Sequence, residues 1–285
     1  MNLLAIRDLD AAALSQILSL SERPSRNSPL AGQGIALYFE KPSARTRNSM
    51  EMAAVQLGAH PVTIGRDEIG IGTRESAQDV ARTLACYHAV IAARVKDHAV
   101  LEQMAAAVDT PVLNLLSDTD HPLQALADLL TIRQLLGRIK GAKVAYVGDP
   151  NNVARSLAEG CALLGAELTI ASPRDYAAAL PGATHVEDPA AAVEGADIVY
   201  TDVWVSMGQD EEADARRRAF APYQVSADLM GACPQAWFMH CLPARRGEEV
   251  VGAVIDGPRS AVWRQAENRM HSARGALAWM LGVHP

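Results

Sequence analysis

Short apolar runs of strand length alternate with longer amphipathic runs along the first half of the chain. This order is typical of parallel sheets covered by helices. The predicted strands are Ile35–Phe39, Pro61–Ile64, Val90–Val95 and Val112–Leu116. The predicted helices are Ala11–Leu20, Ser43–Leu57, Ser76–Tyr87, Leu101–Ala107 and Pro122–Leu136. The alternation therefore predicts an α/β fold.

The same rhythm returns after the break at 137–141. Strands are predicted at Lys143–Val147, Glu167–Ile170, Ile198–Val203 and Trp237–His240, with a last helix at Glu267–Leu281. A chain of 285 residues is long enough for two cores. We expect two domains, each an open parallel sheet flanked by helices. The first is 1–130, joined by the C-terminal helix 267–285, and the second is 131–266, with Pro122–Leu136 as the bridge.

The composition excludes several classes of protein. The net charge of −7 argues against a general binder of nucleic acid or membrane surfaces, so an anionic ligand needs a local basic cluster. We see no signal peptide and no apolar run of membrane-spanning length. The four cysteines have no paired spacing, which disfavours a disulfide framework or a zinc ribbon. We expect a cytoplasmic protein with reduced thiols.

Polar clusters follow the carboxyl ends of six predicted strands, which is where open parallel sheets bind ligands. These clusters are Ser43–Thr46, Arg94, Ser117–Gln124, Gly148–Asn152, Asp202–Gly208 and His240–Pro243. Six such clusters together predict an active site in a cleft between the two domains.

The first cluster suits a phosphate group. Ser43 can cap the following helix, whose free N–H groups and positive dipole end attract an anion. Arg45 adds a guanidinium that matches phosphate oxygens, and Arg47 raises the positive charge further. A simple helix cap is the alternative, but cations at a helix N-terminus oppose the dipole, and a bound dianion would relieve that conflict.

His121 and Gln124 share one face at the start of a helix, where an imidazole and an amide can hold a polarised carbonyl. A capping histidine is the alternative. Arg94 ends a strand and is either a surface ion-pair partner or a further cation for the same anion. Arg269, predicted to open the last helix, either lies on a solvated helix face or belongs to the cleft.

The second half offers groups for a zwitterion. Gly148–Asn152 lacks the third-position glycine of a dinucleotide fingerprint, and no ribose-binding carboxylate follows the next strand, so a nicotinamide cofactor is disfavoured. The asparagine amides suit a carboxylate, and Asp202 suits an ammonium group. Cys241 is either a structural or a reactive thiol, and His240 and Cys241 are a poor metal pair because neighbours on a strand point to opposite faces.

Taken together, these motifs resemble the aspartate/ornithine carbamoyltransferase family, and within it the enzymes that act on ornithine. The resemblance covers nearly the whole chain. It rests on Phe39–Arg47, His121–Asp128, Asp202–Gly208, Met239–Pro243 and Gln265–Arg269.

The resemblance implies a carbamoyl-phosphate-binding first domain and an ornithine-binding second domain. Carbamoyl phosphate would be held by Ser43, Ala44, Arg45, Thr46, Arg94, His121, Gln124, Cys241, Leu242 and Arg269. Ornithine would be held by Asn152, Asp202, Ser206 and Met207. Arg45, His121 and Cys241 would be the catalytic residues, with no metal and no organic cofactor.

The implied reaction carries the carbamoyl group of carbamoyl phosphate to the side-chain amine of L-ornithine, giving L-citrulline and phosphate in arginine metabolism. The implied assembly is a homotrimer or a multiple of trimers. Other acceptors, such as putrescine or an acylated ornithine, stay open, as does an inactive or nucleotide-binding homologue.

Two positions depart from the family pattern. Ala44 replaces a threonine of the phosphate motif, although its backbone N–H remains. Gly70, within Asp67–Glu75, stands where ornithine enzymes usually carry a glutamine that reaches a neighbouring subunit. Thr73 and Arg74 are the candidates to replace that glutamine.

Overall fold

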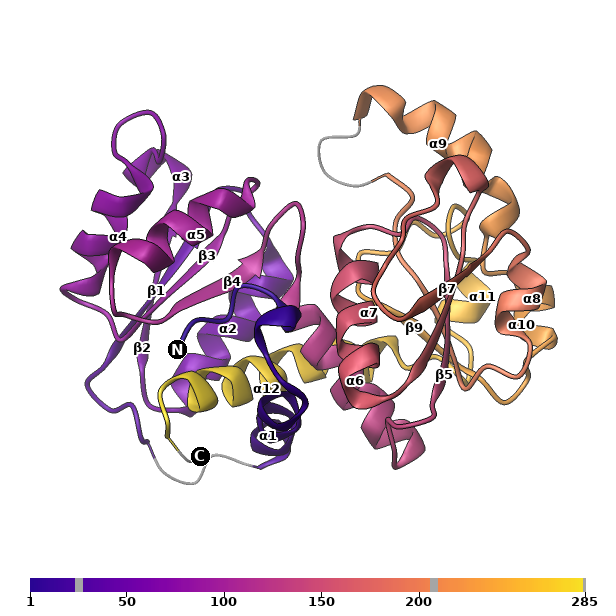
Figure 1. Cartoon of the computed structure of the whole chain (residues 1–285), viewed down its shortest axis with the longest axis horizontal. Helices are drawn as coiled ribbons and strands as arrows, with labels where there is room; N and C mark the ends of the chain where they lie inside the picture. Colours follow the sequence, from indigo (N-terminus) through magenta and orange to yellow (C-terminus); the bar gives the residue numbers. More distant parts are fainter. Residues whose placement is uncertain (24–27, 206–209, 284–285) are drawn as a thin grey trace. The chain divides into compact units, whose positions relative to one another are not determined.

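The computed structural model describes residues 1–23, 28–205 and 210–283. The chain divides into two compact units, Met1–Leu130 with Glu267–Pro285, and Thr131–Ala266. The division falls within helix α6 (Pro122–Leu136) (Figure 1). Among the described helices, none combines the length and the apolar character needed to cross a membrane.

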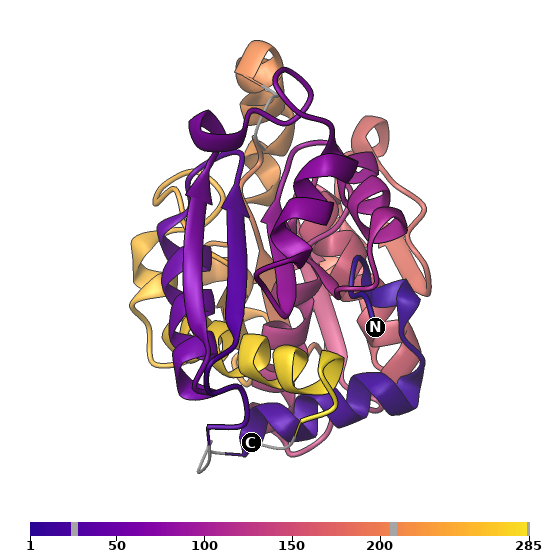
Figure 2. The same ribbon diagram turned by 90° about the vertical axis from the view of Figure 1, so that its left-hand side faces the viewer.

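The first unit contains a parallel four-stranded sheet of order β2-β1-β3-β4. Its strands are β1 (Gly34–Phe39), β2 (His60–Gly65), β3 (Val90–Arg94) and β4 (Val112–Leu116), and its helices include α2 (Ala44–Gln56), α3 (Arg66–Ile69), α4 (Ala77–Ala85) and α5 (His98–Ala107). Alternate strand residues such as Tyr38 and Ile91 pack against α4 and α5. Helix α2 lies against the other face of β1 and β2 (Figure 2).

The two ends of the chain meet in the first unit. Helix α1 (Ala11–Glu22), which follows a short 3₁₀ turn at Ile6–Asp8, runs beside α12 (Val262–Met280) (Figures 1 and 2). Gly275 permits this close approach, because a Cβ there would lie 2.2 Å from the hydroxyl of Ser21. Arg274 donates to the carbonyl oxygens of Ser21 and Arg23, both at 2.7 Å, and so satisfies carbonyls at the C-terminal end of α1.

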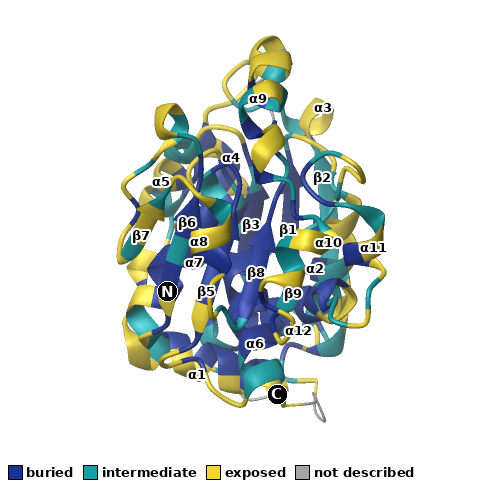
Figure 3. Ribbon diagram, turned by 90° about the vertical axis from the view of Figure 1, so that its right-hand side faces the viewer, coloured by how far each residue is buried: buried dark blue, intermediate teal, exposed yellow. Residues whose placement is uncertain are grey.

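The second unit contains a parallel five-stranded sheet of order β7-β6-β5-β8-β9. The strands are β5 (Lys143–Val147), β6 (Glu167–Ala171), β7 (Ala183–Val186), β8 (Ile198–Thr201) and β9 (Trp237–His240). The helices are α7 (Asn152–Leu164), α8 (Pro189–Val193), α9 (Ala213–Phe220), α10 (Ala227–Gly231) and α11 (Gly252–Ile255), with 3₁₀ turns at Arg174–Tyr176, Asp210–Glu212 and Ala221–Tyr223. One face of the sheet builds a core around Phe220 and Phe238, and β5, β6, β8 and β9 are far more buried than the edge strand β7 (Figure 3).

The predicted fold class is confirmed, and the strand predictions differ from the structure mainly at their ends. Strand β8 stops at Thr201, before the predicted end at Val203, because the chain leaves the sheet at Asp202. Strand β7 was not predicted, since its four exposed or half-buried residues form no apolar run. Helix α12 begins at Val262, well before Glu267, so the prediction that Arg269 opens this helix is wrong.

Candidate active site

The phosphate motif lies at the topological switch point of the first sheet. From β1 the chain passes to β2 on one side, and it later returns to β3 on the other side. The carboxyl ends of β1 and β3 therefore diverge, and open α/β sheets bind ligands at such a point. Ser43–Thr46 follows β1, and Arg94 is the last residue of β3. The sheet order thus brings together two clusters that the sequence separates by about fifty residues.

Ser43 caps helix α2, as predicted. Its hydroxyl accepts a hydrogen bond from the Thr46 N–H (3.4 Å) and donates to the Thr46 hydroxyl (3.1 Å). Ala44 and Arg45 occupy the first turn, where backbone N–H groups have no partner within the helix. The missing threonine hydroxyl at Ala44 leaves this N–H array in place. The end of α2 is therefore suited to an anion.

Three arginine side chains lie close to one another near the start of α2. Burial and, to a smaller extent, the positive charges of Arg269 and Arg45 together lower the pKa of Arg94 to about 10. Arg94 comes from β3, Arg45 from α2 and Arg269 from α12. Such mutual repulsion between the three guanidinium groups is unfavourable, and a bound dianion would relieve it.

His121 lies beside this arginine cluster and is neutral near pH 7. Burial lowers the pKa of its imidazole well below the usual value, and the charges of Arg269 and Arg94 add to the effect. An arginine N–H can only donate, so the contact between Arg269 Nη1 and His121 Nε2 (3.5 Å) makes Nε2 the acceptor. The proton of the neutral ring is then on Nδ1, and a neutral N–H donor suits a carbonyl oxygen.

Arg269 connects the helices around the site, although it lies inside α12. It is buried and donates to the Oε1 atom of Gln124 and to the hydroxyl of Thr46 (3.4 Å). The amide of Gln124 donates in turn to Asp128 (2.8 Å), which is fully buried one turn along α6. Asp128 therefore fixes which end of the Gln124 amide faces Arg269. The sequence-based list of candidate residues omitted this carboxylate, although its i,i+4 spacing from Gln124 was a visible signal.

The second sheet has its own switch point, between β5 and β8. The chain runs from β5 to β6 and β7 on one side and then returns to β8 on the other. Gly148–Asn152 follows β5, and Asp202 follows β8. Asn152 is the first residue of α7, and Asn151 is its cap. The predicted zwitterion-binding groups thus share one edge of the sheet.

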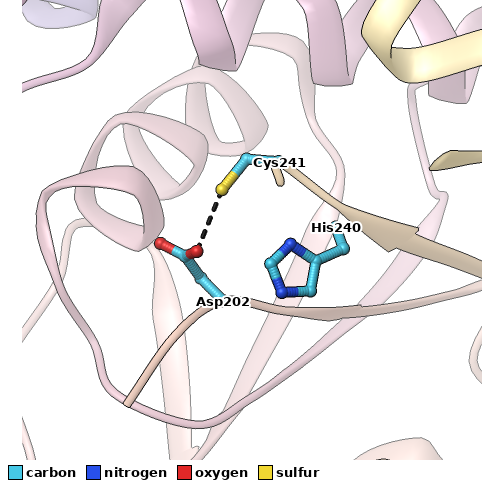
Figure 4. Close-up of side chains that lie close together, drawn as sticks. All are labelled: Asp202, His240 and Cys241. Atoms are coloured by element: carbon cyan, nitrogen blue, oxygen red, sulfur yellow. Dashed lines mark hydrogen bonds between the residues drawn. The ribbon is translucent and has the colours of Figure 1, made fainter. Parts of the chain in front are cut away.

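Asp202 is a buried carboxylate with no cation beside it among the described residues. Its side chain accepts from the Asn151 amide (2.8 Å). It also accepts from the Cys241 thiol at 3.0 Å, the bond drawn in Figure 4. Its residue is 6% exposed, and it forms no ion pair within the described residues. Asp149, equally buried and close by in the sequence, is instead paired with Arg216 at 3.1 Å. A buried carboxylate costs free energy unless it is paired, so Asp202 is suited to an ammonium ligand.

Asp202, His240 and Cys241 place one possible metal-ligand atom each within 4.8 Å of one another (Figure 4). His240 and Cys241 therefore do not point to opposite faces of a strand, as the sequence predicted, because β9 ends at His240 and Cys241 lies beyond it. Both imidazole nitrogens are nevertheless engaged. Nδ1 accepts from the Leu242 N–H (2.8 Å), and Nε2 lies 3.1 Å from the carboxylate of Glu249. Leu242 has a left-handed φ of 59°, a strained conformation typical of functional turns.

The predicted site residues fall into three groups: those in the first unit, those in the second unit and those outside the described residues. Ser43, Ala44, Arg45, Thr46, Arg94, His121, Gln124 and Arg269 belong to the first unit, and Asn152, Asp202, Cys241 and Leu242 belong to the second. Ser206 and Met207 lie outside the described residues.

Gly70 lies in a tight left-handed turn at φ 70°, where a Cβ would lie 3.1 Å from the Thr73 hydroxyl. Thr73 and Arg74 both donate to carbonyl oxygens of their own loop.

Comparison with known proteins decides the family. The model of the carbamoyl-P binding domain of aspartate/ornithine carbamoyltransferase matches residues 1–134, and the model of the Asp/Orn binding domain matches residues 140–280. The chain belongs to the aspartate/ornithine carbamoyltransferase family.

Named relatives of this family are similar over almost their whole length. An ornithine carbamoyltransferase from Hyperthermus butylicus is 51% identical over 98% of this chain and 97% of its own. A protein from Bacillus subtilis with the same name is 42% identical over 98% and 93%. The solved ornithine carbamoyltransferase of Pyrococcus furiosus has a TM-score of 0.93 at 42% identity, covering 99% of this chain and 97% of its own.

The depressed pKa of His121 predicts how stability responds to acid. The unfolded imidazole takes up a proton near pH 6.5, whereas the native ring does not. The free energy of unfolding should therefore fall below pH 6.5, by up to about 1.4 kcal/mol per pH unit for this one group. His121→Gln should flatten the dependence between pH 6.5 and 5.

Chemical denaturation at several pH values measures this slope. His88 and His271, whose pKa values burial also lowers, stay in both proteins and cancel in the comparison. Parallel curves for the two proteins would contradict the prediction.

Proposed function

We propose that this protein transfers the carbamoyl group of carbamoyl phosphate to the side-chain amine of L-ornithine, giving L-citrulline and phosphate. The observation that carries the choice of acceptor is Asp202, a buried carboxylate with no cation among the described residues. An acceptor with a second carboxylate, such as aspartate, would be repelled at this position. An amino acid with an amine in place of that second carboxylate would avoid this repulsion, and its α-ammonium group would form an ion pair with Asp202.

In the proposed complex, the first unit binds the donor. The N–H groups at the start of α2, with Ser43, Ala44 and Thr46, bind phosphate oxygens together with Arg45 and Arg94. His121 and Arg269 donate to the carbonyl oxygen of the carbamoyl group. Gln124 presents its Oε1 to this region, since Asp128 holds its amide nitrogen. An amide oxygen in this orientation can accept from the NH₂ of the carbamoyl group.

The second unit binds the acceptor. Asp202 and Cys241 are the proposed contacts of an ornithine ammonium group, and Asn152 is the proposed contact of its carboxylate. Ser206 and Met207, beyond the described residues, complete the proposed ornithine contacts. Leu242, with Cys241, is the proposed contribution of this unit to the bound carbamoyl group.

Transfer forms one bond and breaks one. The neutral side-chain amine attacks the carbonyl carbon, and the negative charge that develops on the carbonyl oxygen is stabilised by Arg45, His121 and their neighbouring donors. The C–O bond to phosphate then breaks, and the electron pair leaves with the phosphate, which the arginines stabilise. The nitrogen loses one proton to the departing phosphate or to water. Holding both substrates in place can supply up to roughly 7–11 kcal/mol of the acceleration.

We propose that the enzyme acts in arginine metabolism in the cytoplasm, as a homotrimer or a multiple of trimers. The four cysteines, all within the described residues, have no paired spacing and form no disulfide, which fits a reducing compartment. A relative from Pyrococcus furiosus, 45% identical over 96% of this chain, carries the name ornithine carbamoyltransferase, anabolic.

A panel of acceptors tests the proposed reaction. Purified protein with carbamoyl phosphate should form citrulline from L-ornithine, with much lower turnover of putrescine, acylated ornithine and L-aspartate. The measurements are colorimetric ureido-group formation and phosphate release, which should agree in a ratio of one to one. Turnover only with another amine would refute ornithine, and binding of NAD without binding of carbamoyl phosphate in calorimetry would refute the whole assignment.

A further inference from the structure

The side chain of Asn151 caps helix α7 with its oxygen, which also accepts from the Tyr146 hydroxyl (3.5 Å), and bonds to a neighbouring loop with its nitrogen. Its Oδ1 atom accepts from the backbone N–H groups of Val153 (2.9 Å) and Ala154 (3.2 Å) at the start of α7. Its Nδ2 atom donates to Oδ2 of Asp202 (2.8 Å), a residue at the end of the neighbouring strand in the sheet. One side chain thus links the two loops at the switch point of the second sheet.

The orientation of this amide is determined by the helix. Backbone N–H groups can only donate, so the atom that faces Val153 and Ala154 must be the oxygen. The NH₂ group is then directed at Asp202, whose carboxylate can only accept when it is ionised. The two N–H donors also polarise the amide, which strengthens the bond that its NH₂ group makes. The cap is therefore also a fixed donor for the carboxylate.

This donor matters because Asp202 has few other partners. Within the described residues its oxygens are engaged by the Asn151 amide at Oδ2 and by the Cys241 thiol at Oδ1. A thiol is a weak donor, so the amide is the stronger of the two. With Oδ2 held by the amide and Oδ1 by the thiol, the plane of the carboxylate is fixed, and its remaining lone pairs are left for a ligand.

We propose that Asn151 is a positioning residue that holds the side chain of Asp202 oriented for the ammonium group of the acceptor. The inference rests on the proposed binding of ornithine at Asp202 and deepens it. The alternative is that Asn151 only caps α7. The two roles separate cleanly, because aspartate and serine cap helices about as well as asparagine but cannot donate an amide N–H.

The test compares Asn151→Asp and Asn151→Ser with the wild-type enzyme. Both variants keep the cap, so thermal unfolding of Asn151→Ser should change little, whereas Asn151→Asp should unfold at a lower temperature because it places a second carboxylate against the buried Asp202. Hydrogen bonds to charged groups contribute about 1.5–3 kcal/mol, so losing this one should raise KM for ornithine about tenfold or more. Asn151→Asp, which places two carboxylates in contact, should show the larger increase. KM for carbamoyl phosphate should stay within about twofold, because the donor residues are elsewhere.

Asp188→Asn is a matched control in the same unit. Asp188 caps α8 through the Ala190 N–H (2.9 Å), and its exchange for asparagine should leave both KM values unchanged. A variant Asp202→Asn separates the inference from the function on which it rests. If Asp202→Asn raises KM for ornithine while both Asn151 variants do not, Asn151 is only a cap. If Asp202→Asn has no effect on ornithine, both the proposed binding of ornithine at Asp202 and this inference are overturned.

Discussion

Replacement of Arg45 by alanine is expected to lower kcat by about 10²–10³-fold, the usual cost of removing one donor from an oxyanion site. Arg45 lies in the first turn of α2, close enough to Arg94 for its charge to lower the pKa of that residue. It is exposed and its side chain contributes nothing to the core, so unfolding should be unaffected. Steady-state kinetics with both substrates and thermal unfolding of the same preparation provide the two measurements.

Arg47 offers a matched control on the same helix. It is also exposed, and it forms an ion pair with Glu51 at 2.8 Å. Arg47→Ala removes the same charge two residues further along α2, yet it should change kcat less than about threefold, since exposed ion pairs contribute little. An equal decrease in kcat in the two variants would indicate a general effect of charge. A normal kcat in Arg45→Ala would show that this residue has no part in the mechanism.

The fold class followed from the sequence because hydrophobic periodicity reports burial directly. Helix Pro122–Leu136 agrees with the structure residue for residue, and most strands differ by one or two residues. Edge strand β7 was missed because an exposed edge does not need an apolar run. The start of α5 at His98 was missed because Asp97, rather than an apolar residue, marks it by capping the Ala99 N–H.

Part of the candidate site could be predicted because ligand-binding residues in open parallel sheets follow the carboxyl ends of the strands. The sequence places Ser43, Arg94 and Asp202 at carboxyl ends of strands, but the sheet order decides which of these ends are neighbours. Contacts that depend on packing had no local signal. The bond from Arg269 to Gln124 requires α12 to fold back over a chain separation of well over a hundred residues, and this is visible only in three dimensions.

The uneven pairing of Asp149 and Asp202 predicts opposite effects for two similar substitutions. Asp202→Asn removes a buried charge that no cation balances within the described residues, so it should leave the free energy of unfolding unchanged or slightly higher. It should lower kcat/KM for ornithine at least about a hundredfold, because the ammonium group loses its ion pair. KM for carbamoyl phosphate should change little.

Asp149→Asn should instead lower the stability of the protein and have little effect on the use of ornithine. It breaks the 3.1 Å pair with Arg216, which is 8% exposed, and leaves that guanidinium with the exposed carboxylate of Glu212 (3.3 Å) as its remaining ion-pair partner among the described residues. The burial that raises the pKa of Asp149 shows how little solvent is available to compensate. The expected result is a lower free energy of unfolding, by about 3–5 kcal/mol, with a smaller change in KM for ornithine.

Denaturant unfolding and initial-rate kinetics should be measured for both Asp202→Asn and Asp149→Asn, so that stability and the use of ornithine can be compared between them. The proposed role of Asp202 requires that stability and ornithine binding respond to different carboxylates, although both are buried at the same edge of one sheet. If Asp202→Asn unfolds the protein more readily than Asp149→Asn does, Asp202 is a structural group. That no cation pairs with it in the described part of the chain would then have nothing to do with the ammonium group of a substrate.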